Sequence, residues 1–273
     1  MRRALRTSLL AVPAALGLTV TTATSANAHY VYYADIIWSN ADSSRCMISY
    51  SETSHGSSGG GYYKGESRSR AELSSFPSEC VVPYEKNTGH LGEAFRIFKW
   101  YVDSAGDGSW LLCWQTERDW YKNSEPSSDL RLQMSDVPAE GLCGPGYYGL
   151  NNYAIMYDNG TWVGGSPMWS GYHWLPDGTP PEPEPTEPAP PLEIPPGGGS
   201  TSKASQKVGV LGKTGKPVIG VDGKPVKVNP APELPDARNS ASGGGGKRHT
   251  EVNENGSVTE VVELESKMLP AAR

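Results

Sequence analysis

The sequence predicts an all-β fold: a small, disulfide-stapled antiparallel sandwich or barrel, followed by a Pro/Gly linker and a largely disordered tail. Every aromatic residue lies between Tyr30 and Trp174, namely eight Trp, fourteen Tyr and three Phe. The four cysteines fall in the same window, and short β-rich runs there alternate with turn residues. Because rings supply much of the buried area of a small core, we expect one packed domain over residues 29–176.

The first 28 residues have the pattern of an export signal. Three arginines precede an apolar run from residue 9 to residue 20, and a small-x-small cleavage site ends at Ala28. A membrane anchor is the alternative, but the run is shorter than the roughly 20 residues that span a bilayer. We therefore expect a secreted, extracellular protein whose mature chain begins at His29.

Turn residues separate the predicted strands. Residues 95–102 and 109–115 flank an Asp/Gly turn, and residues 153–157 and 161–163 flank an Asn-Gly turn, so each pair predicts a hairpin. Residues 130–134 alternate apolar and polar side chains, which indicates a half-buried strand. Further strands are predicted at 30–38 and 46–52 and from Tyr62 onward, which makes seven or eight short strands in all.

Export makes disulfides the default state of Cys46, Cys80, Cys113 and Cys143. Three pairings are possible, and the absence of a Cys-x-x-Cys pair argues against a zinc or redox site. We favour the sequential pairing, Cys46 with Cys80 and Cys113 with Cys143, because each bond then staples neighbouring strands in one half of the domain. Each bond closes a loop of about 30 residues and contributes about 3 kcal/mol.

The composition changes after Pro176. Residues 177–202 form a Pro/Glu-rich and then Gly-rich linker, which favours a semi-rigid spacer with a flexible joint. Residues 203–273 contain too little apolar surface to fold alone, so we expect a low-complexity, mostly disordered tail. A Gly-Lys-Pro-Val motif recurs there after eight residues and could add a strand to a partner's sheet. Residues 255–260 fit either a helix capping box or an Asn-Gly hairpin.

Charge and motifs exclude several function classes. Residues 29–176 carry ten Lys and Arg against seventeen Asp and Glu, so a nucleic-acid partner is not expected. Residues 56–60 match a nucleophile elbow, but no helix is predicted after them. Glu52 with His55, and His90 with Glu93, are too few for a metal centre. We therefore expect no enzyme, no cofactor, no metal and no membrane insertion.

Aromatic residues are then the candidates for binding. Trp110, Leu112 and Trp114 are expected on one face of a strand, with Cys113 on the other. Exposed Trp and Tyr anchor protein interfaces and also provide flat platforms for sugars. The candidate binding residues are Trp110, Trp114, Tyr147, Tyr148, Trp169, Tyr172 and Trp174.

The chain resembles small secreted proteins of actinobacteria. The shared features are the run at residues 35–39, the four spaced cysteines, the Cys-Gly-Pro-Gly at residues 143–146 and the closing run at residues 169–173. Within that group it is similar to the adaptor subunit of antibacterial umbrella toxin particles, in which a small β-rich protein links a lectin-like subunit to a toxin-bearing one. The resemblance covers at most residues 30–174 and implies assembly with extracellular protein partners. A neutral-polysaccharide-binding module and a protease inhibitor using the loop at residues 54–62 are the alternatives.

Overall fold

The computed structural model describes residues 30–55, 62–76, 79–116, 120–176, 207–212, 214–229, 231–235 and 246–264. Within them the chain forms a short 3-10 turn at Ala139–Gly141 and fourteen strands. The strands are β1 (Tyr30–Ser39), β2 (Arg45–His55), β3 (Tyr62–Phe76), β4 (Glu79–Pro83), β5 (Leu91–Val102), β6 (Gly108–Gln115), β7 (Tyr121–Lys122), β8 (Asp129–Pro138), β9 (Gly146–Asp158), β10 (Thr161–Leu175), β11 (Val208–Gly209), β12 (Lys227–Val228), β13 (Lys247–Val252) and β14 (Val258–Glu263).

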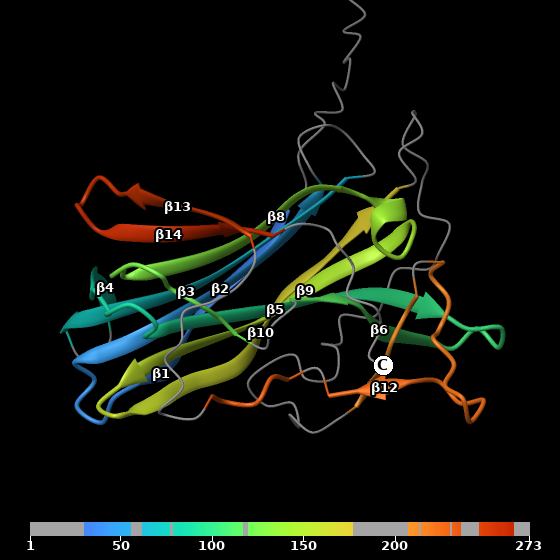
Figure 1. Cartoon of the computed structure of the whole chain (residues 1–273), viewed down its shortest axis with the longest axis horizontal. Helices are drawn as coiled ribbons and strands as arrows, with labels where there is room; N and C mark the ends of the chain where they lie inside the picture. The colour runs from blue at the N-terminus through green and yellow to red at the C-terminus, as the bar shows by residue number, and fades with distance from the viewer. Residues whose placement is uncertain are drawn as a thin grey trace, which may run out of the picture.

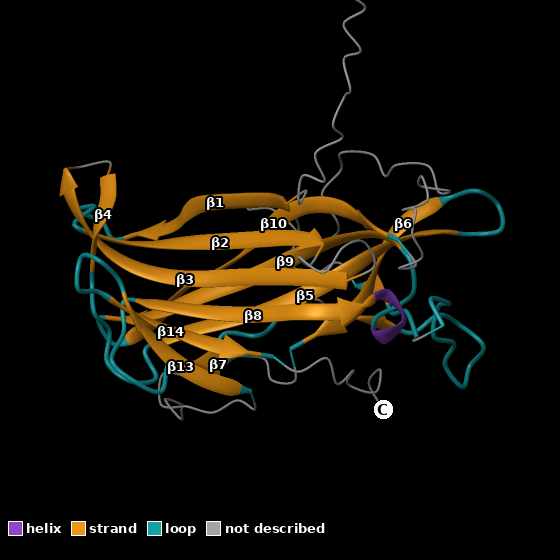
Figure 2. Ribbon diagram, turned by 90° about the horizontal axis from the view of Figure 1, so that it is seen from above, coloured by secondary structure: helices purple, strands orange, loops and turns teal. Residues whose placement is uncertain are grey.

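Two sheets stack face to face, so the predicted all-β fold is confirmed and takes the form of a sandwich (Figure 2). The first sheet has the strand order β1-β2-β3-β8-β14-β13, with β4 on the side of β3. The second has the order β10-β9-β5-β6, with β7 on β5. Neighbours pair antiparallel except β14 and β8, which pair parallel.

The two hairpins that local sequence predicts are both present. In the turn between β5 and β6, the backbone amides of Ala105 and Asp107 donate to Asp103 Oδ1 at 2.8 and 3.0 Å. Between β9 and β10, Asn159 and Gly160 have φ angles of 46° and 87°. Positive φ at both central positions is the requirement of a tight hairpin turn, which Asn-Gly meets at little energetic cost.

The main core lies between the sheets. Leu130, Leu132 and Met134 of β8 face Phe95 and Leu150 of the second sheet, and all five side chains are fully buried. The predicted alternation of β8 therefore points its apolar residues inward. Strand β5 is buried from Leu91 to Trp100 without interruption. A strand buried on both faces needs a further layer outside its sheet.

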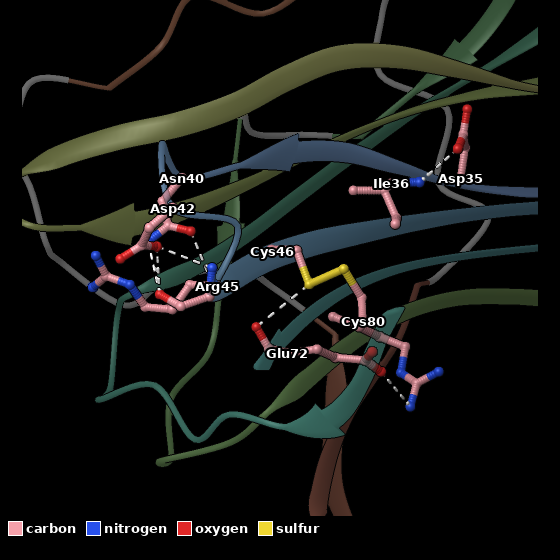
Figure 3. Close-up of a disulfide and its surroundings, with 10 residues drawn as sticks. Asp35, Ile36, Asn40, Asp42, Arg45, Cys46, Glu72 and Cys80 are labelled. Atoms are coloured by element: carbon pink, nitrogen blue, oxygen red, sulfur yellow. Dashed lines mark hydrogen bonds and ion pairs between the residues drawn. A yellow bond between two sulfur atoms is a disulfide. The ribbon is translucent and has the colours of Figure 1, made fainter. Parts of the chain in front are cut away.

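The disulfides follow the sequential pairing. Cys46 of β2 bonds to Cys80 of β4 within the first sheet (Figure 3). Cys113 of β6 bonds to Cys143, which precedes β9 in the second sheet. The sequential pairing is as predicted, but the bonded segments are not neighbouring strands, because β2 and β4 both pair with β3 and β5 lies between β6 and β9.

Part of the tail differs from the expectation of disorder. The β13–β14 hairpin continues the first sheet beyond β8, with Thr259 opposite Asp129 and Glu263 opposite Gln133 (Figure 1). Of the two alternatives at residues 255–260, the hairpin is the one that forms, and Gly256 in its turn has a φ of 78°. Residues 29–176 are therefore not the whole folded unit.

Residues 207–235, which we call the outer strap, supply the layer outside the second sheet. Val208 and Val228 pack against one apolar cluster on its outer face, and Ala231 packs against a second. The Trp120 indole N–H donates to the Glu233 carbonyl at 2.7 Å. The predicted export signal and the 177–202 linker lie outside the described residues.

Candidate interaction surface

Two of the predicted binding rings lie inside the sandwich. Trp114 packs in the main core, with its ring centroid 5.2 Å from that of Phe95. The ladder pairs Ile97 with Trp114 and Phe98 with Leu112, so Cys113 is an extra residue on β6. Such a bulge interrupts the alternation of faces. Trp114 therefore does not share a face with Trp110, contrary to expectation.

Tyr148 is the second of these core rings, and it is 1 % exposed. Its hydroxyl accepts from the Cys143 amide at 3.2 Å and donates to the Gly144 carbonyl. These bonds hold the segment that carries one half of the Cys113–Cys143 disulfide. Tyr148 therefore serves the fold and is not available to a partner.

The other predicted rings gather on the outer face of the second sheet as an outer aromatic cluster: Trp110, Tyr147, Trp169, Tyr172 and Trp174. Trp110 and Trp169 meet edge-to-face with centroids 5.1 Å apart. Trp110 is 5 % exposed because the outer strap covers the cluster, and Trp169, Tyr172 and Trp174 are half-buried. The sequence left open which of these rings are exposed; the structure buries Trp110 and Tyr147 and half-buries the other three, since part of the tail that was expected to be disordered packs over them.

Among the described residues, the two most exposed aromatic side chains lie instead on β1. Tyr32 and Tyr33 are 55 % and 53 % exposed, and Ile36 on the same strand is also exposed. Strand β1 is the last strand of the first sheet at one end. Sequence reasoning missed these residues because a strand rich in Tyr and Ile has the composition of a core strand. Only the sheet order places it at an edge.

Tyr32 continues into a mixed aromatic and charged face on β2 and β3. Its ring stacks on Tyr50 with centroids 5.8 Å apart, and the Arg68 guanidinium lies 5.4 Å from the centroid of Tyr50. The Tyr50 hydroxyl donates to the Glu52 carboxylate. Burial, and then the Glu52 carboxylate, raise the pKa of Tyr50, so its hydroxyl stays protonated. We call Tyr32, Ile36, Tyr50 and Arg68 the tyrosine face.

Ion pairs hold Arg68 in place. Arg68 Nε lies 2.6 Å from Glu66 Oε1, and Arg131 Nε approaches the same oxygen at 3.5 Å. Both Arg68 and Arg70 lie 3.9 Å from Asp129 Oδ2. Burial raises the pKa of Asp129, while the arginines oppose that shift. The network fixes an otherwise flexible arginine beside the tyrosine rings.

A polar cluster is sealed between the sheets. Asn152 Nδ2 of β9 donates to Glu93 Oε1 of β5 at 2.9 Å and to Ser49 Oγ of β2 at 2.8 Å. All three residues are 0 % exposed. Burial raises the pKa of Glu93 well above its usual range. A carboxyl group closed off from solvent in this way joins the two sheets rather than meeting a substrate.

The remaining His and carboxylate pairs do not converge. His55 packs against His173, and His90 packs against Tyr157, each with centroids 4.9 Å apart. A cavity of about 320 Å³ beside His90 is lined by Arg45, Lys86 and Asp158 among others. There the Asp158 carboxylate pairs with both cations. In the part of the chain that the structure describes, no three His, Cys, Asp or Glu side chains are grouped to hold a metal ion.

Neither a family model, nor a curated protein, nor a solved structure matches this chain. Among the described residues, no helix has the length and apolar character needed to cross a membrane. The nucleophile-like run at residues 56–60 lies outside the described residues, as does most of the loop at residues 54–62.

Proposed function

We propose that this chain is a secreted, non-enzymatic binding protein that acts as an adaptor in an extracellular protein assembly. The observation that carries the proposal is the tyrosine face beside the exposed edge strand β1. Tyrosine and arginine are the residue types enriched at the energetic centre of protein interfaces. Here both are exposed or half-exposed on one rigid, disulfide-stapled sheet.

The two end strands of the first sheet support β1 as the partner side. Strand β13 has the sequence KRHTEV, and such charges deter another strand from pairing with an edge. Strand β1 has the sequence YVYYADIIWS, in which Asp35 is the single charged residue. A long apolar edge in an exported protein is an aggregation hazard unless a partner covers it.

Affinity purification from culture supernatant tests the proposal. A tagged mature protein should recover a stoichiometric protein partner, and the pair Tyr32→Ala and Ile36→Ala, both exposed on the tyrosine face, should lose it. Val252→Ala is the matched control, because Val252 is 73 % exposed at the opposite end of the same sheet. Equal recovery by both variants would exclude the tyrosine face as the docking surface.

A carbohydrate-binding module is the second candidate. The stacked pair Tyr32 and Tyr50 provides a flat exposed ring with polar groups beside it, which suits a neutral sugar. Tight retention on a polysaccharide resin, abolished by Tyr32→Ala and accompanied by no protein partner, would replace the adaptor proposal with this one.

A further inference from the structure

Some apolar residues of the outer strap are buried against the domain, and others are exposed to solvent. Val208 and Val210 are nearly fully buried against the second sheet, and Leu211 is 1 % exposed as a member of the main core. Ile219 and Val221 of the same segment point into solvent. Gly209 lies between buried residues of the strap. Its backbone is so close to Leu111 that a Cβ at position 209 would lie 2.9 Å from the Leu111 side chain. The strap is thus shaped to fit the sheet that it covers.

The strap also holds its own shape. Val210, Val218 and Val226 recur at eight-residue intervals and bond to one another through the backbone. The Val218 amide donates to the Val210 carbonyl and the Val226 amide to the Val218 carbonyl, both at 2.8 Å. The Val210 amide returns to the Val226 carbonyl at 3.2 Å. The repeated Gly-Lys-Pro-Val motif therefore builds a two-turn coil whose hydrogen bonds are internal.

Attachment of the coil to the domain is mostly apolar. Among the described residues, its ladder to β6 is a single parallel bridge between Leu112 and Val210, with the Leu211 amide donating to the Leu112 carbonyl at 2.8 Å. Strand β14, in contrast, pairs with β8 over five residues. An element with internal bonds and few bonds to its host can leave without breaking its own structure.

We propose that the outer face of the second sheet is an acceptor site for an outer strap in trans, so that residues 207–235 of a second copy can replace the chain's own. The contacts of a strap in cis and in trans are the same, because both are made by the same residues. Thirty residues separate Pro176 from Lys207, and ten separate Pro235 from Gly246. At about 3.3 Å per residue, these lengths reach a neighbouring domain.

Closure in cis has an effective concentration of roughly millimolar, so an isolated copy keeps its own strap. Strap exchange links two copies when a strap leaves its own domain or when the protein concentration is high. This site is separate from the tyrosine face, and the proposal stands or falls independently of the proposed function.

Capture between two differently tagged full mature chains tests the exchange. One chain carries Val208→Asp and Val210→Asp, which place charges at buried positions and release its own strap. Its acceptor site is open, so at protein concentrations near the millimolar effective concentration of closure in cis this chain should capture wild-type protein. A chain carrying Val221→Asp is the matched control, since that exposed change leaves the strap seated, and it should capture less than a tenth as much.

A fluorescent peptide of residues 207–235 gives the direct measurement. It should bind the Val208→Asp, Val210→Asp chain at least tenfold more tightly than the wild type, and a peptide with the same two Asp changes should bind at least tenfold more weakly. Near-ultraviolet circular dichroism checks the fold, and the milder pair Val208→Thr and Val210→Thr replaces the Asp pair if that signal is lost. A folded, strap-defective chain that takes up neither peptide nor wild-type protein would overturn the proposal.

Discussion

Replacing Glu260 should loosen the tail hairpin from the domain. The Glu260 carboxylate is 1 % exposed and accepts from the Ser124 amide and hydroxyl, both at 2.7 Å, and from the Glu125 amide at 3.1 Å. It also pairs with Arg248 of β13. Hydrogen bonds to a charged group contribute about 1.5–3 kcal/mol each, and removing one partner of a buried ion pair costs about 3–5 kcal/mol. Because Arg248 retains some contact with solvent, we expect Glu260→Ala to cost about 3 kcal/mol.

Urea unfolding followed by tryptophan fluorescence measures this loss, which corresponds to a decrease of about 6–12 °C in Tm for a domain of this size. Glu263→Ala is the control, because Glu263 lies on the same strand and is exposed, and it should change the free energy of unfolding by less than about 0.5 kcal/mol. If Glu260→Ala is as stable as Glu263→Ala, the carboxylate does not anchor the hairpin and the reasoning is wrong.

Three further outcomes are expected. Burial raises the pKa of Glu93 in the folded state well above that of an unfolded glutamate, which is about 4.3, so wild-type stability should fall as pH rises from about 4.3 through the raised pKa. Glu93→Gln should remove that loss, and a Tm difference that stays constant from pH 4 to pH 8 would contradict the assignment. A chain ending at Pro176 should bind a hydrophobic dye and have a Tm more than about 5 °C below that of the full-length chain, because the truncation exposes the outer aromatic cluster and the β8 edge. An unchanged Tm would show that the tail adds no stability. Mass spectrometry should find no free thiol, and reduction of the two disulfides should lower the free energy of unfolding by several kcal/mol. Four alkylatable cysteines in folded protein would refute the pairing.

Local signals in the sequence predicted the local parts of the fold. The Asn-Gly turn at residues 159–160, the Asp/Gly turn after β5 and the alternation of β8 each depend on neighbouring residues, and all three form as expected. The sequential disulfides also join segments about 30 residues apart within one sheet. Local sequence patterns are enough to predict contacts between residues that are close together in the sequence.

Contacts between distant segments were not predictable in the same way. The bulge at Cys113 moves Trp114 to the other face of β6, and no Gly, Pro or other turn residue in the sequence indicates that bulge. The tail is poor in apolar residues, so its composition favours disorder, yet Val261 and Val262 are buried beside β8. Their burial depends on a surface that residues 30–176 provide. The edge position of Tyr32 follows likewise from sheet order, which composition does not encode.

Because β14 pairs with β8 from a distant part of the sequence, the first sheet can be completed only after β14 is available. The hydroxyl of Ser128, one residue before β8, donates to the Val258 carbonyl, which lies 130 residues further along the chain. A polypeptide emerges with its N-terminus first, so the amides and carbonyls on that side of β8 stay unpaired until β14 has been synthesised. Strand edges left open during folding are sites of intermolecular association. Closure of the sheet at β8 therefore joins segments 130 residues apart, and the edge of β8 is open to association until β14 pairs with it.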